Sequence, residues 1–213
     1  TVSGNTASDG GGVVVDTGGV TMEGGTIGGN TAASGGGGVH VVGHFTMSGG
    51  SVTGNAAGST GGGVHAAGNF TMSGGSVSGN AAGSTGGGVY VTGSGNFTIS
   101  GGSVGGNTAA SGGGGVLVTG PSSSFKMSGS AAVHTNNPVR LDSGRVITLS
   151  GSLSANPAAN IETSSTGILV LGDDPGTPDN DITDGDNYKK FWLNGQSNAA
   201  GNKIDSFGRI LSL

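Results

Sequence analysis

Short apolar motifs recur along the chain from Val2 to Asn156, with a period of 25 residues or slightly more. Motifs that occupy the same position in successive repeats are called a column. The first column pairs an aliphatic residue with an asparagine three places later. Its copies are Val2/Asn5, Ile27/Asn30, Val52/Asn55, Val77/Asn80, Val104/Asn107, Val133/Asn136 and Leu153/Asn156. Because the register is kept over so many copies, the glycine-rich stretches between them belong to a repeating structure rather than to linkers.

Two further columns keep step with the asparagines. The second follows a glycine-rich turn, and the third pairs an aromatic or aliphatic residue with a long apolar one. The second comprises Val13/Val15, Val39/Val41, Val64/Ala66, Val89/Val91 and Val116/Val118, and the third comprises Val20/Met22, Phe45/Met47, Phe70/Met72, Phe97/Ile99, Phe125/Met127 and Ile147/Leu149. Alternation with a period of two is typical of strands that bury one face.

These columns predict an all-β fold, a right-handed parallel β-helix with three short strands per coil of about 25 residues. The units are too short for pairs of helices, and their Gly, Ser and Thr content disfavours helix. Equivalent strands of successive coils would pair at about 4.8 Å. Right-handedness follows from the crossover rule for parallel strands. We expect about seven coils followed by a C-terminal cap.

Two groups of residues are expected to maintain the coils. The glycines before each valine of the second column predict corners that need a positive φ or a close approach to the next coil. The asparagines predict a ladder of amides at another corner, and the phenylalanines predict a stack of rings inside. The ladder residues are Asn30, Asn55, Asn80 and Asn107, and the stacked rings are Phe45, Phe70, Phe97 and Phe125.

The domain boundaries are predicted at the positions where the repeating pattern becomes irregular. Residues 1–171 are predicted to form the coils, regular over 1–130 and degenerate over 131–171. The next word of the third column after Leu149 is Phe191-Trp192-Leu193, so residues 172–188 are predicted to be an inserted loop. Residues 189–213 are then the last coil or a cap that covers the end of the solenoid.

The inserted loop is rich in aspartate and is the one candidate for a cofactor. Asp179, Asp181, Asp184 and Asp186 could hold calcium, but the spacing differs from that of an EF-hand and no bidentate Glu follows. Two interpretations therefore remain, a calcium site and a solvated acidic loop. No other cofactor is expected.

Composition narrows the classes of partner. The chain of 213 residues has 51 glycines, 9% charged residues and a net charge of −5, so it has no basic stripe for nucleic acid or an anionic membrane. No apolar run approaches the ~20 residues of a spanning helix, so membrane insertion by this segment is not expected. The absence of cysteine fits a secreted bacterial surface protein and many cytosolic proteins alike. The first residues, "TVSGN", fall midway through a repeat, which predicts either a segment of a longer protein or coils that stack end to end into filaments.

Candidate chemistry must lie on the outward positions. One outward row is Val14, His40, His65, Tyr90, Leu117, Arg140 and Leu169. His40 and His65, with His44 nearby, form either a metal pair or an exposed ladder. Over residues 1–130 the acids are Asp9, Asp16 and Glu23, all in the first coil, and Lys126 is the only Lys or Arg, so no acid pair for glycoside hydrolysis is expected.

Two other outward features have polar side chains. Arg140, Asp142 and Arg145 form a polar cluster on the later coils, interpreted as a solvated turn. A row of Thr and Ser beside the third column, such as Thr46/Ser48 and Thr71/Ser73, resembles a surface that orders water, which makes ice binding an alternative. Threonine is also a good strand residue on any exposed face.

The stretch "VSGNAAGSTGGGVY" at 77–90 resembles the repeats of chlamydial polymorphic membrane proteins, whose signatures are F-x-x-N and G-G-A followed by Ile, Leu or Val. Here VSGN at 77–80 corresponds to the first signature with Val for Phe, and GGV at 87–89 to the second without the alanine. The chain is also similar to Gly/Ser-rich repeat arrays of large surface proteins in spirochaetes and gut bacteria. The likeness covers about residues 1–156. It implies an autotransporter or adhesin-like surface protein with a parallel β-helix passenger.

The sequence therefore predicts a non-enzymatic, extracellular structural or adhesive segment of a bacterial surface or fibrous protein. Its expected partners are a glycan or protein of a host or environmental surface, or other copies of itself end to end. Filament assembly, carbohydrate binding or cleavage, and ice binding are the alternatives.

Overall fold

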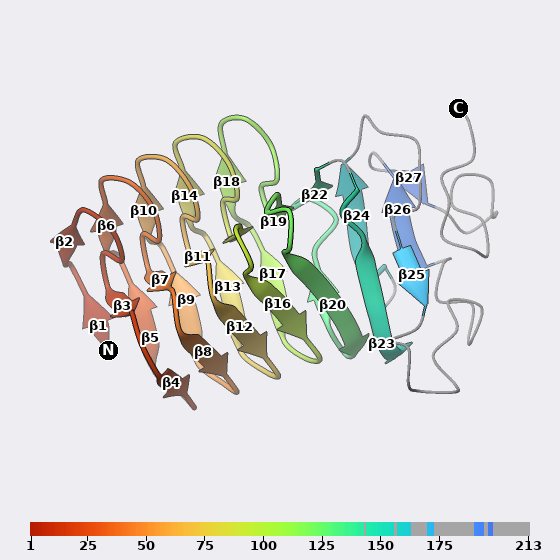
Figure 1. Cartoon of the computed structure of the whole chain (residues 1–213), viewed down its shortest axis with the longest axis horizontal. Coiled ribbons are helices and arrows are strands. Elements are labelled where there is room, and N and C mark those ends of the chain that lie inside the picture. The colour runs from red at the N-terminus through yellow and green to blue at the C-terminus, as the bar shows by residue number, and fades with distance from the viewer. Residues whose placement is uncertain (143, 156, 163–169, 173–189, 194–195, 198–213) are drawn as a thin grey trace.

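The computed structural model describes residues 1–142, 144–155, 157–162, 170–172, 190–193 and 196–197. Over these residues the chain is a β-solenoid of about six turns whose coils stack through parallel strands, with no α-helix. Figure 1 shows the coils side by side along the long axis, each strand beside its equivalent in the next coil. The all-β parallel β-helix predicted from the sequence is confirmed. In the described part of the chain, no helix has the length and apolar character needed to cross a bilayer.

Each regular coil contains four short strands rather than the three expected. The coil of residues 26–50 is built from β5 (Thr26–Gly28), β6 (Thr31–Ala32), β7 (Val39–Val41) and β8 (His44–Met47). The overlooked strand is β6. It has only two residues, which is too short for an alternating pattern to identify it.

The four strands of each coil belong to four parallel sheets, which we call sheets A to D. Sheet A comprises β1 (Val2–Ser3), β5, β9 (Ser51–Thr53), β13 (Ser76–Ser78), β17 (Ser103–Gly105) and β21 (Ala132–Val133). Sheet B comprises β2 (Thr6–Ala7), β6, β10 (Ala56–Ala57), β14 (Ala81–Ala82) and β18 (Thr108–Ala109). Sheet C comprises β3 (Val13–Val15), β7, β11 (Val64–Ala66), β15 (Val89–Val91), β19 (Val116–Val118), β22 (Val139–Leu141), β24 (Ala159–Glu162), β26 (Phe191–Leu193) and the antiparallel β27 (Gln196–Ser197). Sheet D comprises β4 (Gly19–Met22), β8, β12 (Asn69–Met72), β16 (Asn96–Ile99), β20 (Ser124–Gly129), β23 (Ile147–Leu153) and β25 (Val170–Gly172).

Equivalent residues of successive coils lie directly over one another in the interior. The phenylalanine rings stack with centroids 5.4 Å apart between Phe45 and Phe70, 4.8 Å between Phe70 and Phe97, and 5.1 Å between Phe97 and Phe125. The last pair is nearly parallel, at 1°. All four side chains are buried, so the core is a set of columns of like residues.

The glycine-rich corner between sheets B and C satisfies both expected requirements. Gly36 has φ +68°, a backbone conformation that other L-residues rarely adopt. A Cβ on Gly37 would lie 2.5 Å from backbone atoms of Ala56 and Gly62 in the next coil. Only glycine allows the backbones of neighbouring coils to approach this closely.

The degenerate coils differ from the sequence expectation in two positions. Asn137, not Asn136, takes the place below Asn107, because its Oδ1 accepts the hydrogen bond from the Asn107 backbone N–H at 2.7 Å. Glu162, not Leu169, follows Arg140 in the outward row of sheet C. Asn156 and Leu169 themselves lie outside the described residues.

The strand that contains Phe191 lies in a different sheet from the one predicted. Phe191 was expected to continue the third column, but β26 pairs with β24 in sheet C, and Phe191 lies in register with Ala159. Both Ala159 and Phe191 are buried. The predicted aspartate loop, with Asp179, Asp181, Asp184 and Asp186, lies outside the described residues, as does most of the expected cap. The calcium site therefore stays a prediction.

A polar groove as the candidate functional site

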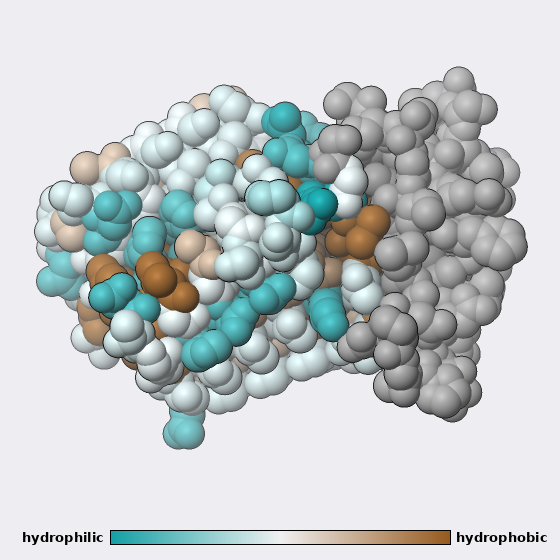
Figure 2. Space-filling view, viewed as in Figure 1, coloured by the Kyte–Doolittle hydropathy of each residue, from teal (hydrophilic) through white to brown (hydrophobic). Residues whose placement is uncertain are grey.

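The outer face of sheet D carries a groove of about 590 Å³ that crosses successive coils. Its lining residues are polar apart from one of the stacked phenylalanines. The lining residues are His44, Phe45, Thr46, Asn69, Thr71, Asn96, Thr98, Ser124 and Lys126. In Figure 2 a hydrophilic band runs obliquely across the front of the molecule over β8, β12 and β16.

Strand alternation places these side chains outside. In β12 the side chains of Phe70 and Met72 point into the core, so Asn69 and Thr71 point outward. The same alternation in β8 and β16 repeats the arrangement, and the coils pair in register. Two outward rows result. The first is His44, Asn69, Asn96 and Ser124, and the second is Thr46, Thr71, Thr98 and Lys126.

The first row is a continuous chain of hydrogen bonds. The Ser124 hydroxyl donates to Asn96 Oδ1 at 2.6 Å, and Asn96 Nδ2 donates to Asn69 Oδ1 at 2.8 Å. Asn69 Nδ2 lies 2.9 Å from His44 Nδ1. We call this chain the polar row. It runs along the solenoid axis and joins four coils from the outside.

The direction of the polar row fixes the tautomer of His44. Asn96 Nδ2 also donates to the carbonyl of Ser94 at 3.2 Å, which orients the Asn96 amide. Asn69 must then present its oxygen to Asn96 and its nitrogen to His44. Because an amide nitrogen only donates, Nδ1 of neutral His44 accepts, and its proton is on Nε2. His44 is exposed, so the row ends in a ring N–H that faces solvent.

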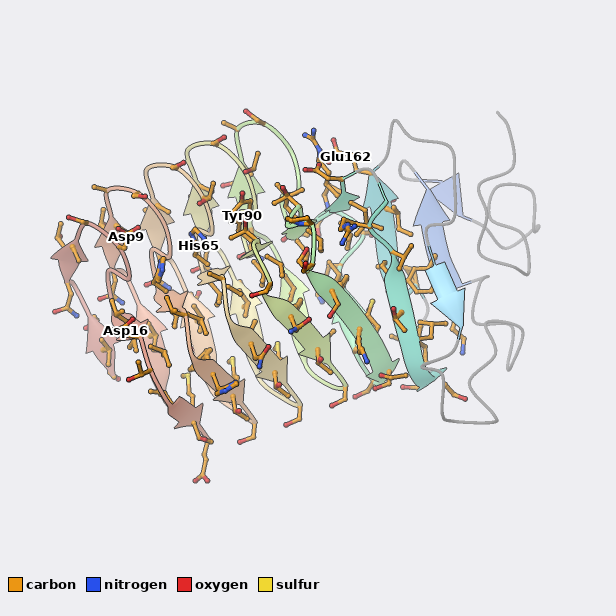
Figure 3. All side chains as sticks on the ribbon, in the orientation of Figure 1. Asp9, Asp16, His65, Tyr90 and Glu162 are labelled. Atoms are coloured by element: carbon orange, nitrogen blue, oxygen red, sulfur yellow. The ribbon has the colours of Figure 1, made fainter. Side chains whose placement is uncertain are left out.

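The outward row of sheet C is, by contrast, partly covered. The rings of His40 and His65 have centroids 4.8 Å apart, and the rings of His65 and Tyr90, nearly perpendicular at 88°, have centroids 5.0 Å apart. A Cβ on Gly35 would lie 2.3 Å from His65 Nδ1, so the loop before β7 packs over this ring. Figure 3 shows His65, Tyr90 and Glu162 succeeding one another along the solenoid.

This cover changes the protonation of one histidine. Burial lowers the pKa of His65 to about 4, with a smaller lowering effect from His40 and an opposing effect from Asp9. Nδ1 of His40 lies 4.0 Å from Asp9 Oδ1, too far for a hydrogen bond, and that carboxylate oxygen accepts a hydrogen bond from the Gly35 backbone N–H at 3.1 Å. Within the described residues, no three His, Cys, Asp or Glu side chains are grouped to hold a metal ion.

The asparagine ladder lies inside rather than at a surface. Each asparagine Nδ2 donates both to the Oδ1 of the next asparagine and to a backbone carbonyl of the preceding coil, as Asn80 does to Asn107 at 2.9 Å and to Val52 at 3.0 Å. Asn30, Asn55, Asn80 and Asn107 are all buried. These residues therefore have a structural role at the corner between sheets A and B.

The polar cluster of the later coils connects loops. Arg140 Nη1 donates to the Ser111 carbonyl at 2.8 Å, and its Nε lies 3.9 Å from Asp142 Oδ1. Arg145 Nη1 donates to the carbonyl of Pro121 at 2.7 Å. The two guanidinium groups thus bind backbone of the preceding coil.

The sequence did contain a signal for the polar row. Every phenylalanine of the third column follows a polar residue, in the words His44-Phe45, Asn69-Phe70, Asn96-Phe97 and Ser124-Phe125. The threonine row follows the phenylalanines and was predicted from the sequence, whereas the polar row precedes them and was not predicted.

Comparisons of the chain with protein-family models, with curated proteins and with solved structures found no match.

Proposed function

We propose that this chain is a non-enzymatic structural segment of an extracellular bacterial surface protein, a rigid solenoid that presents its sheet D face for adhesion. The observation that carries the proposal is the register of the interior, which is kept from coil to coil up to Met127. Like residues stack from coil to coil, and the buried amides of the asparagine ladder hydrogen-bond each coil to the next. Such an interior resists local opening and holds outward side chains at fixed spacing.

Two features support the proposal. The V-x-x-N and GGV motifs resemble the repeats of surface-displayed β-helix passengers. The outward rows over 1–130 are almost uncharged, which suits contact with a surface more than it suits acid-base chemistry.

The location is tested with an antibody raised against the chain, applied to intact cells of the organism that makes it. We expect labelling of intact cells and loss of the signal when a protease is added outside. Labelling that requires permeabilised cells would refute the surface role. The non-enzymatic part is tested separately, since sustained release of reducing sugar from a polysaccharide would contradict it.

A further inference from the structure

We infer that the groove on sheet D binds a neutral polysaccharide lying along the solenoid axis. The inference rests on the proposed adhesive function and names the chemical class of its ligand. The groove crosses four coils. At about 4.8 Å per coil, the span from His44 to Ser124 is about 14 Å, the extent of a short run of sugar units rather than of one small molecule.

The charge of the lining selects a neutral ligand. No carboxylate is among the described lining residues, and Lys126 is their one lysine or arginine, at one end. A polyanion such as a nucleic acid requires several cations along its length. A cationic ligand would find no counter-charge among the described residues of the groove. The middle coils therefore offer only uncharged groups, at Thr46, Thr71, Asn69, Asn96 and their neighbours.

The hydrogen-bonding groups are fixed in place before any ligand arrives. An amide has two N–H donors and an oxygen with two lone pairs, and the polar row uses one of each at Asn69. Asn69, His44 and the threonines all line the groove, so their unused hydrogen-bonding capacity is available to a ligand there. Sugar hydroxyls both donate and accept, so they match such a mixed array. Preorganised side chains lose little conformational entropy on binding.

The backbone of sheet D rules out a peptide that adds as a strand. β12 is paired on both sides, with β8 and with β16, so the groove floor has no unpaired strand edge over these coils. A ligand must be recognised by side chains alone. Threonine suits a sugar here, because it offers a hydroxyl and a methyl group on the same carbon, and a sugar ring also has hydroxyl and C–H groups.

The test is retardation of the full chain in native gels that contain dextran, mixed-linkage β-glucan or galactomannan as neutral probes, and alginate or polygalacturonate as anionic ones. The test variant is Thr46→Val with Thr71→Val, which removes two groove hydroxyls from adjacent coils while keeping side-chain shape. The matched control is Thr26→Val with Thr53→Val, at outward positions of adjacent coils in sheet A. We expect at least one neutral polysaccharide to retard the chain, and the groove variant to bind it about tenfold more weakly.

Several outcomes would overturn the inference. These are no retardation by any neutral probe, equal loss in the groove and control variants, or stronger retardation by the anionic probes. Thermal hysteresis that the groove variant abolishes would assign the face to ice instead. Both variants should melt at the same temperature as the parent within a few degrees, which keeps loss of folding from imitating loss of binding. Failure of the surface labelling would refute the proposed function and leave these binding results standing.

Discussion

Replacing Asn80 by alanine is expected to remove a large part of the stability of the solenoid. The Asn80 side chain makes four hydrogen bonds in the interior. Nδ2 donates to the carbonyl of Val52 at 3.0 Å and to Asn107 Oδ1 at 2.9 Å. Oδ1 accepts from the backbone N–H of Asn55 at 3.0 Å and from Asn55 Nδ2 at 2.9 Å. Asn80→Ala removes all four and leaves the Asn55 backbone N–H without its acceptor.

The magnitude follows from these contacts. A buried donor left unsatisfied destabilises a fold by about 1–3 kcal/mol, and each further lost hydrogen bond by about 0.5–1.5 kcal/mol. Water cannot easily replace the bonds, because Asn80 and Asn55 are each 1% exposed. We expect the free energy of unfolding to fall by about 3–5 kcal/mol. For a chain of this size that corresponds to a melting temperature lower by about 10 °C.

Guanidinium unfolding followed by circular dichroism measures the change. The matched control is Asn69→Ala, the same substitution in the polar row, where the side chain is half-buried and solvent can replace its bonds to His44 and Asn96. Its expected loss is under about 1 kcal/mol. If the two variants lose the same stability, the argument that the interior ladder holds the coils together is wrong.

Three further predictions test other parts of the fold. Phe70→Ala should lower the free energy of unfolding by about 3–5 kcal/mol, because it empties one position of a buried ring stack; a loss below about 1 kcal/mol would contradict its interior position. Gly37→Ala should prevent or strongly weaken folding, since its Cβ would meet backbone at 2.5 Å, whereas Gly24→Ala, with no atom within 4 Å, should change the melting temperature by no more than a few degrees. The lowered pKa of His65 means that the unfolded chain binds a proton more readily, so stability should decrease as the pH falls from about 6.5 to about 4. His65→Leu, which copies Leu117 of the same row, should reduce this slope in unfolding curves recorded at several pH values, and an unchanged slope would count against the buried neutral ring.

The interior could be predicted from the sequence because its columns repeat the same residues. Phe45, Phe70 and Phe97 are spaced by 25 and 27 residues, and the structure keeps them in register despite the two added residues. Those residues lie in the turn between Val91 and Asn96, where they change the outline of the coil and not its core. A sequence pattern identifies such columns well, because burial restricts which side chains can fill them.

Two assignments made from the sequence were wrong because residue spacing and residue type do not determine which residues contact one another between coils. Val133-x-x-Asn136 fits the first column by spacing, but one more residue enters the turn, and the Asn137 amide reaches the ladder instead. The third-column assignment of Phe191 rested on residue type, which does not distinguish two interior columns that both accept large apolar side chains. The strand pairing decides, because Phe191 lies in register with Ala159 of sheet C. Which residues lie in register between two coils is known only from the three-dimensional structure.

The groove could be predicted from the sequence only in part. Outward positions follow from inward ones, so the row with Thr46, Thr71 and Thr98 was accessible from the pattern. Whether outward side chains bond to one another depends on their rotamers and on the direction of each amide. The pattern contains neither. The Asn96 to Asn69 bond therefore had to come from the structure.

The like-on-like stacking of the core makes individual windings interchangeable. The coil that contains Val52, Asn55, Phe70 and Met72 packs against nearly the same side chains in the coil before it as in the coil after it. In-frame gain or loss of a whole 25-residue unit would therefore join surfaces that already match. Such a gain or loss would change the length of the rod by steps of about 4.8 Å while leaving a folded product.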